Sequence, residues 1–498
     1  MRFYEKQGVP FHSGFLPFLG HYYELIKFQK KNNPTLHPLI EYIQTYFDQK
    51  PPVFSGIIFS QRLCLFVNRP EALRELFVSK NRFFDKHPSS GNILKKIAGD
   101  SIAFQKSNQI WAKKRKVISS SLYKQKLIVM LDIMKEIVLE TKDQWAKQGT
   151  IDIVQETSNM MMTIILACAF GRQNENPLIN YKEKGEIRQI QLGQALSTNL
   201  GRAIEREFQP YLIFFPELFP YYLSILDQEV KYNAEQVIEY IRKIIQIKRV
   251  NFAQTGHYEG DDLLSVLLQD DVFQDSDQMI IDECITFFIA GSQTIAVAIS
   301  NFLSYMAQSQ EHENQIRMEF GKLLQNYGMD IQKLAQELDL RKIEEFEYLK
   351  CCYNETLRIE PPLIISSSVQ LTEDQQIAGV NIKQDDMLII NIYQIHHNKD
   401  QWIDDEKFIP ERFNPQSQYY LTPAGTQRDQ FSFVPFLGGK RICLGKTFAE
   451  NAFKIIVPLL MNNYKFVLCD DKQKIQKPFF NAIMFKRPQV FMKLERIN

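Results

Sequence analysis

Residues 431–450 read FSFVPFLGGKRICLGKTFAE and contain the pattern on which the fold assignment depends. Five residues of this stretch form the pattern F-x-x-G-x-R-x-C-x-G: Phe436, Gly439, Arg441, Cys443 and Gly445. At roughly 1 in 20 per fixed position, about 490 starting points would give this pattern by chance in on the order of 10⁻⁴ of chains of this length. The pattern is therefore specific, and the rest of the chain is interpreted around it.

The residue types around Cys443 suit a cysteine that binds a metal. Residues 431–434 are expected to form a short strand, and the glycines are expected to let the backbone lie against a flat group. Apolar residues recur at helical spacing from Phe448, in a helix that Pro458 is expected to kink or end. Free N–H groups at the start of a helix lower the pKa of a nearby thiol and favour the metal-binding thiolate. A lone cysteine is more often a buried structural residue, but the glycines and Arg441 favour ligation here.

This stretch resembles the haem-thiolate loop of the cytochrome P-450 family. The resemblance implies a mainly α fold with a minor β lobe, the cytochrome P-450 fold, and haem b as the cofactor. It implies that Cys443 is the axial iron ligand, that Phe436 shields the sulfur and that Arg441 pairs with a haem propionate. Gly439 and Gly445 belong to the same cofactor-binding loop.

Length and composition indicate a globular chain with a large core. The chain has 498 residues, of which 45% are hydrophobic and 23% are charged. A net charge of +1 argues against nucleic acid as a partner and leaves electrostatic docking to a local patch. The seven cysteines are odd in number and lack C-x-x-C spacing, which favours a reducing compartment over a disulfide framework. Because no linker divides the chain, residues 36–498 are expected to form a single haem-thiolate domain.

Residues 1–35 form a proline-containing segment that matches neither a signal peptide nor a membrane span. The segment resembles the hinge that follows a membrane anchor in microsomal members of the family. We therefore expect either a truncated chain or peripheral membrane contact, at the cytoplasmic face of the endoplasmic reticulum by resemblance. Residues 210–226 pack aromatic residues between three prolines, and we expect them to be buried or to form an exposed apolar patch that contacts the membrane.

Hydrophobic periodicity predicts the remaining elements. Strands are predicted over residues 53–59 and 62–67, and a helix begins at Pro70, a residue that favours the first helical turn. Residues 81–108 show no regular period, and a long irregular segment in a compact domain is usually functional. Further helices are predicted at 38–48, from 109, over 127–170 as two helices, around 234–245, and over 277–307 with Ser276 as the N-cap.

The helix that begins at Gln109 places Trp111 and Arg115 four residues apart on one face. Without context, a surface helix with one anchoring tryptophan is the commoner interpretation. The W-x-x-x-R pattern resembles the family's helix that binds haem propionates. Lys113 and Lys116 lie on other faces and form either a solvated surface or a basic patch for an electron-donating partner. The resemblance implies an NADPH-dependent flavoprotein reductase as that partner, with cytochrome b5 as a further donor.

The longest predicted helix contains the sequence Ala290-Gly291-Ser292-Gln293-Thr294 at its middle. Glycine inside a helix costs about 1 kcal/mol relative to alanine, so Gly291 indicates close approach by another body. Thr294 can bond to the Ala290 carbonyl or release its hydroxyl to a ligand or water. The sequence resembles the family's oxygen-activation motif, A-G-x-(Asp/Glu)-T-(Thr/Ser), so these residues are the catalytic candidates. Gln293 replaces the acid, and glutamine can hold water but cannot carry a proton as a carboxylate does.

Glu355 and Arg358 lie three residues apart on a predicted helix, and Arg412 follows in the sequence P-E-R-F. An E-x-x-R pair is commonly a surface pair. By resemblance, these three residues form the salt-bridge network that holds the segment leading into the haem loop. Such a buried network fixes geometry more than it adds stability, because desolvation offsets much of the Coulomb attraction.

The substrate pocket is expected to be apolar. Residues 363–369 are expected to form a strand near the haem edge, where this chain has serines and many members have a basic residue. The terminal hairpin is expected to reach the same pocket with its tip. The predicted lining favours lipophilic substrates such as fatty acids, sterols or xenobiotics, and it consists of Phe104, Phe288, Ile364, Ile365 and Phe479.

The function implied by the resemblance is monooxygenation, in which one oxygen atom from O2 enters a lipophilic substrate with electrons from a reductase. Two alternatives remain open. Gln293 in place of an acid suits a reductase-independent isomerase, dehydratase or peroxygenase that acts on an oxygenated substrate. The third possibility is a non-catalytic haem sensor or carrier.

Overall fold

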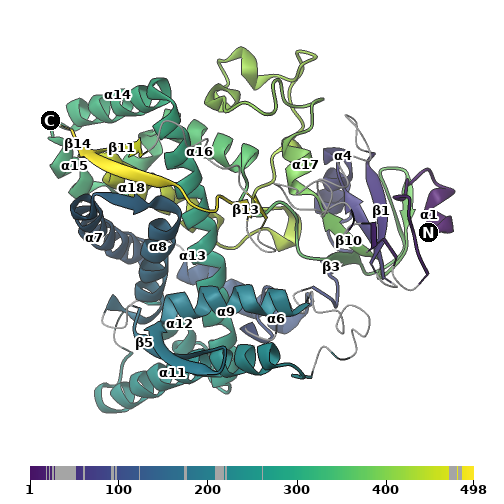
Figure 1. Cartoon of the computed structure of the whole chain (residues 1–498), viewed down its shortest axis with the longest axis horizontal. Helices are drawn as coiled ribbons and strands as arrows, with labels where there is room; N and C mark the ends of the chain where they lie inside the picture. Colours follow the sequence, from purple (N-terminus) through teal and green to yellow (C-terminus); the bar gives the residue numbers. More distant parts are fainter. Residues whose placement is uncertain are drawn as a thin grey trace.

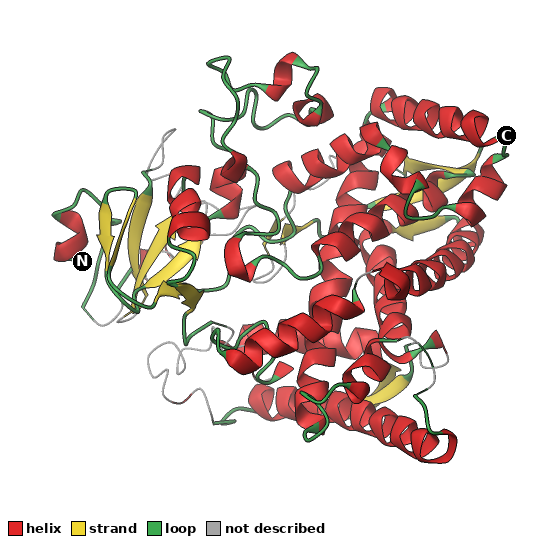
Figure 2. Ribbon diagram, turned by 180° about the vertical axis from the view of Figure 1, so that it is seen from behind, coloured by secondary structure: helices red, strands yellow, loops and turns green. Residues whose placement is uncertain are grey.

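Two hydrophobic cores organise the fold, a larger one among the helices and a smaller one in a β lobe (Figure 2). The chain is mainly helical with a minor β lobe, as the sequence predicted. The computed structural model describes residues 1–17, 20–21, 23–24, 27, 52–59, 62–90, 95, 98–122, 124–172, 176–207, 218, 221–258, 260, 262–469, 479–480 and 485–497. The predicted helix over 38–48 lies outside these residues, as do residues 210–217 and 219–220 of the segment 210–226.

The β lobe contains a five-stranded sheet of order β1-β2-β10-β7-β3. The two predicted strands, β1 (Phe54–Phe59) and β2 (Arg62–Val67), form its antiparallel hairpin, and β10 pairs in parallel with β2. This pairing joins the start of the chain to a segment more than 300 residues later. The remaining strands are β3 (Phe84–Lys86), β7 (Val369–Leu371) and β10 (Met387–Ile390). Next to the sheet, α4 (Pro70–Arg74) begins at Pro70 as predicted and continues into the π-helical turn η1 (Glu75–Ser79).

The N-terminal segment packs onto the β lobe (Figure 1). Helix α1 (Arg2–Glu5) buries Tyr4, and the Tyr4 hydroxyl donates to Asp386. Phe11 lies against Gly56 of β1, where any side chain would collide with the Phe11 ring. Through these contacts Tyr4, Val9 and Phe11 become part of the smaller core.

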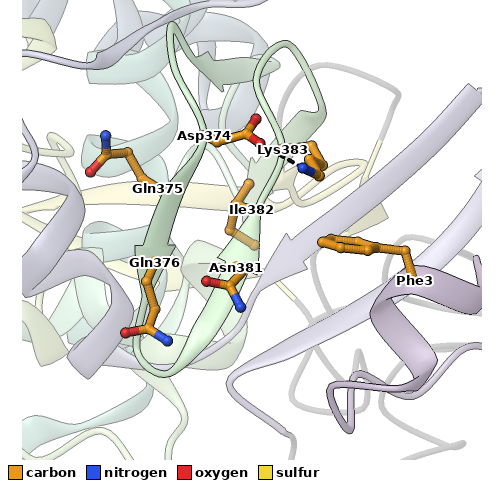
Figure 3. Close-up of a pocket in the computed structure, with 7 residues that line it drawn as sticks. All are labelled: Phe3, Asp374, Gln375, Gln376, Asn381, Ile382 and Lys383. Carbon is orange, nitrogen blue, oxygen red and sulfur yellow. Dashed lines mark hydrogen bonds and ion pairs between the residues drawn. The ribbon is translucent and has the colours of Figure 1, made fainter.

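A surface pocket lies between α1 and the hairpin of β8 (Gln375–Ile377) and β9 (Val380–Ile382) (Figure 3). Its exposed side chains include an ion pair, with Lys383 Nζ 2.6 Å from Asp374 Oδ2. None of the described lining residues is a cysteine or a histidine. The pocket belongs to the β lobe, so it is separate from the loop that carries Cys443.

Helix α13 (Asp277–Gln308) runs through the middle of the helical body (Figure 1). The side chain of Ser276 accepts from the Met279 N–H and caps the helix, as predicted. Helix α8 (Ile153–Phe170) packs along α13. By length and composition, both helices are apolar enough to cross a membrane. However, 72% of the apolar 18-residue stretch in each helix is buried within the protein, as expected of core helices.

The other helices surround this pair. The predicted pair over 127–170 corresponds to α7 and α8, and the helix predicted around 234–245 is part of α11. These helices are α6 (Gln109–Ser121), α7 (Lys124–Gln148), α9 (Leu192–Glu207), α11 (Ile225–Thr255), α12 (Leu263–Gln269), α14 (Gln310–Tyr327), α15 (Ile331–Glu337), α16 (Glu347–Ile359) and α18 (Lys446–Met461). Helix α17 (Ile392–His396) buries Ile392 and Ile395 in the core of the β lobe instead. Small sheets at the periphery comprise β11 (Tyr464–Leu468), β14 (Phe491–Arg496) and β4 (Thr150–Asp152), then β5 (Leu178–Glu183) with β6 (Glu186–Gln191), and β12 (Phe479–Phe480) with β13 (Phe485–Lys486).

Residues 363–369 and 431–434 do not form the two strands that the sequence predicted. At both segments a side chain accepts a hydrogen bond from an N–H group that a strand ladder would use. In residues 363–369, only Val369 is in a strand, and the Ser366 hydroxyl accepts from the Ile390 N–H at 2.9 Å. In residues 431–434, the Val434 N–H donates to a histidine side chain, and the 3₁₀ turn η7 (Gln430–Ser432) precedes it.

Pro458 lies inside α18 and does not end it. Proline lacks an N–H group, so it removes one helical hydrogen bond, which would otherwise reach the carbonyl of Lys454. The buried residues that follow Pro458 continue the helix to Met461.

Candidate haem-thiolate site

Cys443 lies in a tight loop between the 3₁₀ turn η8 (Gly439–Arg441) and α18. The Cys443 N–H donates to the Phe436 carbonyl at 3.0 Å and closes the loop. Helix α18 begins at Lys446, so its first N–H groups lie near the thiol, as the sequence predicted. Part of the Cys443 side chain is accessible to solvent, so the residue is exposed. Its sulfur nevertheless lies among many protein atoms, and this burial affects its pKa.

The glycines before Cys443 pack closely against other parts of the protein. A Cβ atom on Gly438 would lie 2.5 Å from the Phe77 ring of η1. Gly439 has φ +63°, and a Cβ atom there would lie 2.5 Å from Asn81 Oδ1, which accepts from the Lys440 N–H at 2.8 Å. The glycines therefore dock the cysteine loop on the turn that follows α4.

The pKa of the Cys443 thiol is raised, although the helix N-terminus acts to lower it as the sequence predicted. Burial is the largest cause and disfavours the thiolate. The N–H groups of Gly445 and Lys446, together with Arg115, act in the opposite direction without outweighing burial. Because burial favours the protonated thiol, a metal that binds Cys443 must displace the thiol proton.

The cysteine loop lies beside the middle of α13. The ring of Phe448, in the first turn of α18, packs edge-on against Phe287 of α13 with centroids 6.1 Å apart. Phe287 precedes Ala290 by one turn, and Ala290 is exposed on a helix whose neighbouring residues are mostly buried. Cys443 and the Ala290–Thr294 segment therefore approach the same part of the interior.

Hydrogen bonds hold the side chains of Thr294 and Gln293 in this segment. Thr294 Oγ1 donates to the Ala290 carbonyl at 2.8 Å, one of the two states predicted for it. Gln293 Nε2 donates to Ser158 Oγ of α8 at 2.8 Å, so this amide group is directed at the neighbouring helix. Gly291 also faces α8, since a Cβ atom there would lie 2.9 Å from Ile165 Cδ1. The close approach that Gly291 indicated is therefore helix packing.

Trp111, Arg115 and Arg441 are brought together. The Arg441 guanidinium lies 4.1 Å from the centroid of the Trp111 ring, and that of Arg115 lies 5.5 Å from it. Arg115 Nη2 donates to the Ile442 carbonyl at 2.6 Å, which ties α6 to the residue before Cys443. Three cationic or N–H-bearing side chains thus gather at one side of the cysteine loop.

Asp85 is a partner of Arg441 that the sequence did not reveal. Arg441 Nη2 lies 2.5 Å from Asp85 Oδ1, and both side chains are buried. Burial acts to raise the pKa of Asp85, but Arg441 and the N–H groups of Lys86 and Ser107 outweigh it and lower the pKa. Asp85 stands in a short strand without any motif, so no local pattern could have found it.

The donor set fits a haem. The Cys443 sulfur is a soft, accessible ligand of the type that binds iron. The Nε atom of Arg441 is buried without a hydrogen-bond partner among the described residues, so an acidic group from a bound molecule would satisfy it. Trp111, Arg115 and Arg441 would hold the acidic groups, and haem would supply the chemistry of oxygen activation.

Glu355, Arg358 and Arg412 form one fully buried network. Arg358 donates to both Glu355 carboxylate oxygens at 2.7 and 2.8 Å, and Arg412 Nε donates to Glu355 Oε1 at 3.1 Å. The arginines also bind backbone carbonyls, including that of Asp405, to which Arg358 donates at 2.8 Å. The network therefore fixes the path of the segment that contains the 3₁₀ turn η5 (Pro410–Phe413).

The predicted pocket residues have different environments. Phe104 is buried, and Phe288 is fully buried with its ring 5.0 Å from that of Phe170 of α8, so Phe288 packs in the helical core. Ile364 is fully buried, and Ile365 is half-buried. Phe479 lies in β12, and its side chain is outside those that the structure describes.

The fold and the cysteine loop define the class as haem-thiolate proteins. The family model named Cytochrome P450 matches residues 13–494, and the chain belongs to this family. It is a cytochrome P450 monooxygenase, an oxidoreductase with a haem cofactor. The family generally uses O2, a redox partner and lipophilic substrates.

Two relatives and one solved structure illustrate the similarity. The Taurochenodeoxycholic 6 alpha-hydroxylase of Sus scrofa is 25% identical over 78% of this chain and 74% of its own length. The 11-oxo-beta-amyrin 30-oxidase of Medicago truncatula is 27% identical over 72% of this chain and 65% of its own length. The structure described as retinoic acid bound cyanobacterial CYP120A1 aligns with a TM-score of 0.76 at 22% identity, covering 98% of this chain and 99% of that chain. It shares the fold.

Proposed function

We propose that this enzyme inserts one oxygen atom from O2 into a lipophilic small molecule, with electrons from an NADPH-dependent flavoprotein reductase. The exposed Cys443 thiol precedes a helix that packs on α13 through Phe448 and Phe287, and this observation carries the proposal. Relatives named as a taurochenodeoxycholic hydroxylase and an 11-oxo-beta-amyrin oxidase support a lipophilic substrate class.

In this proposal the cofactor is haem b, and each predicted binding residue has a role. Cys443 would ligate the iron as a thiolate, and Phe436 would shield the sulfur. Trp111, Arg115 and Arg441 bind the propionates. Gly439 and Gly445 permit the tight path of the loop, since Gly439 has φ +63° and Gly445 has the Cys443 sulfur as the nearest atom to its Cβ position, at 4.0 Å.

Proton delivery depends on Thr294 and water. The Thr294 hydroxyl bonds to the Ala290 carbonyl and can exchange this partner for a water molecule. Gln293 uses its Nε2 atom on Ser158, which leaves its carbonyl oxygen to orient water. Since an amide cannot carry the proton, we propose that water passes it to the site directly.

The docking face for the reductase is formed by the exposed lysines around the cysteine loop. Lys113 and Lys116 are exposed on α6, and Lys446 is exposed in the first turn of α18. Arg115 links these elements through the Ile442 carbonyl. A basic surface this close to the ligand cysteine suits an acidic flavoprotein, and cytochrome b5 is a second candidate donor.

Membrane contact is proposed for residues 1–35 and 210–226, on the cytoplasmic face of the endoplasmic reticulum. Exposed apolar side chains support this proposal. Phe15 and Leu16 are exposed in the first segment, and Tyr221 and Leu223 are exposed in the second. The proposed catalytic domain is residues 36–498, and Tyr4, Val9 and Phe11 of the first segment pack onto its β lobe.

The deciding experiment measures substrate-dependent NADPH consumption and product formation by the purified haem protein with and without reductase, over a panel of lipophilic compounds chosen by difference spectra. Turnover only with reductase supports the proposal. Because Gln293 is bonded to Ser158 and no acid stands there, a reductase-independent isomerase, dehydratase or peroxygenase is the second candidate. Turnover of an oxygenated substrate or of peroxide without reductase would support that candidate instead.

A further inference from the structure

Residues 99–104, named the strap here, are fastened to α13 by side chains that no motif contains. The Asp100 N–H donates to Asp282 Oδ2 at 2.9 Å, and Thr286 Oγ1 donates to Ser101 Oγ at 2.7 Å. Gly99 has φ +54°, and any side chain there would collide with the Asp282 carboxylate. The strap also carries Phe104, a predicted pocket residue.

Glu283 holds the middle of the strap. Its two carboxylate oxygens accept from the Ile102 N–H at 3.0 and 3.2 Å. Lys114 Nζ of α6 lies 3.1 Å from Glu283 Oε1 and also donates to the Asp100 carbonyl at 3.3 Å. Both side chains of this ion pair are buried, at 0% and 2% exposure.

The carbonyl of Ile102 binds two of the proposed haem-binding residues. Trp111 Nε1 donates to it at 3.0 Å, and Arg441 Nη1 donates to it at 3.3 Å. The N–H of Ile102 is therefore fixed by Glu283 of the oxygen-activation helix, while its carbonyl orients Trp111 and Arg441. A continuous set of hydrogen bonds joins α13 to the propionate side of the cysteine loop.

A buried ion pair is weak evidence for stability, because desolvation offsets the attraction. Burial raises the pKa of Glu283 to about 7, although Lys114 acts to lower it, so the charged pair is costly to keep. An apolar pair would fill the space but would leave the Ile102 N–H without an acceptor. An apolar pair could therefore not hold Ile102 in the position that the Glu283 carboxylate imposes.

We infer that Glu283, with Lys114 as its counter-ion, is a positioning residue that fixes the strap and, through the Ile102 carbonyl, holds Trp111 and Arg441 in place at the haem-binding side of the cysteine loop. This inference rests on the proposed function, because it assumes that Trp111 and Arg441 bind haem. Glu283 itself contacts neither haem nor substrate in this role.

Two double variants distinguish the positioning role of the Glu283 side chain from the effect of the charges on Glu283 and Lys114. Lys114→Met with Glu283→Gln removes both charges but keeps a carbonyl oxygen that accepts from the Ile102 N–H. Lys114→Met with Glu283→Leu removes both charges and the acceptor. Neither variant leaves an unpaired buried charge, which is why the pairs are preferred to single changes.

Two quantities are measured on the purified holoprotein: hydrogen exchange of peptides covering residues 98–104, and the rate of haem transfer to an apoprotein acceptor. We expect the Gln double variant to match the wild type within about twofold. We expect the Leu double variant to show strap exchange and haem loss faster by about tenfold, the effect of losing one buried hydrogen bond. If both double variants matched the wild type, or if both showed faster strap exchange and faster haem loss, the inference would be overturned.

The haem measurement also separates this inference from the proposed function. If the wild type binds haem but the Leu double variant loses it no faster, the positioning role is wrong and the proposed function stands. If the wild type binds no haem, the proposed function is wrong and the inference falls with it. Exchange of the strap in the unliganded protein then reports only on the local fold.

Discussion

His396 Nε2 accepts a hydrogen bond from the Val434 N–H at 2.9 Å, and this contact joins the buried Glu355 network to the entrance of the cysteine loop. On the other side, the His396 carbonyl accepts from Arg358 Nη1 at 3.1 Å. Because Nε2 is an acceptor, the ring proton must lie on Nδ1, which has no partner among the described residues. His396 is therefore a neutral histidine, fixed by its hydrogen bonds to Val434 and Arg358.

This neutral histidine should make folding sensitive to acid. Burial, with Arg358 as a second cause, lowers the pKa of His396 to about 3, below its ordinary value of 6.5. The unfolded chain then takes up a proton before the folded chain does, so the stability due to His396 is present above pH 6.5 and is lost as the pH falls toward 3. His396→Gln keeps an acceptor and does not titrate. The advantage of the wild type over this variant in free energy of unfolding should shrink by about 2–3 kcal/mol between pH 7 and pH 4.5.

Urea unfolding at several pH values measures this difference. The exposed His257→Gln is the matched control and should show a smaller pH-dependent difference. A His396→Gln difference that stays constant with pH would show that His396 is not held neutral in the folded protein.

Removal of one cation from the buried network should be strongly destabilising. Arg412→Ala leaves Glu355 with one charged partner fewer at a fully buried site, and breaking a buried pair typically costs about 3–5 kcal/mol. The exposed pair of Arg242 and Glu239 provides the control, because Arg242→Ala should cost less than about 1 kcal/mol. Chemical denaturation of both variants is the measurement, and similar costs for the two would contradict the role assigned to Arg412.

The glycines of the cysteine loop should respond differently from a glycine in an open helix. Gly438→Ala places a Cβ atom 2.5 Å from the Phe77 ring, and overpacking of this kind costs about 1–3 kcal/mol. Gly321→Ala in α14 meets no atom within 4 Å and should stabilise the protein by about 1 kcal/mol, since alanine favours helix. Adding Phe77→Leu should recover part of the Gly438→Ala loss. Thermal unfolding tests this, and equal effects at both glycines would contradict the packing argument.

Residues of α13 should affect coupling and leave haem binding intact. Thr294→Ala removes the hydroxyl that can hold water, so less of the consumed NADPH should appear as product. Gln293→Glu places a carboxylate where the amide now bonds to Ser158, and a proton-carrying group there should raise the product formed per NADPH. Ser158→Ala controls for loss of the bond between the helices. Unchanged coupling in all three variants would mean that protons do not reach the site along this helix.

The sequence was sufficient to predict features that depend on local spacing. The cysteine loop, the helix after it and the capped start of α13 follow from residues within a few turns of each other. Glu355 and Arg358 also lie on one helix, so their pairing is local. These features set the fold class and most of the candidate site.

The sequence was insufficient where distant side chains meet. Asp85 and Arg441 are separated by more than 350 residues, and Lys114 and Glu283 by more than 160, so no periodicity relates them. The strand expected over 363–369 fails for a similar reason, because Ser366 takes an N–H group of β10 that only the fold brings near. The helix N-terminus acts to lower the pKa of Cys443 as predicted, but burial, which depends on the whole fold, outweighs it.

Thiolate ligation by Cys443 is the central claim, and the ferrous carbonyl spectrum tests it most directly. The wild type should show the absorption typical of thiolate-ligated haem, and Cys469→Ser, at a half-buried cysteine near the C-terminus, should leave it unchanged. Cys443→Ser should abolish that absorption, because the soft thiolate donor is lost. A normal thiolate-type spectrum from Cys443→Ser would contradict the account.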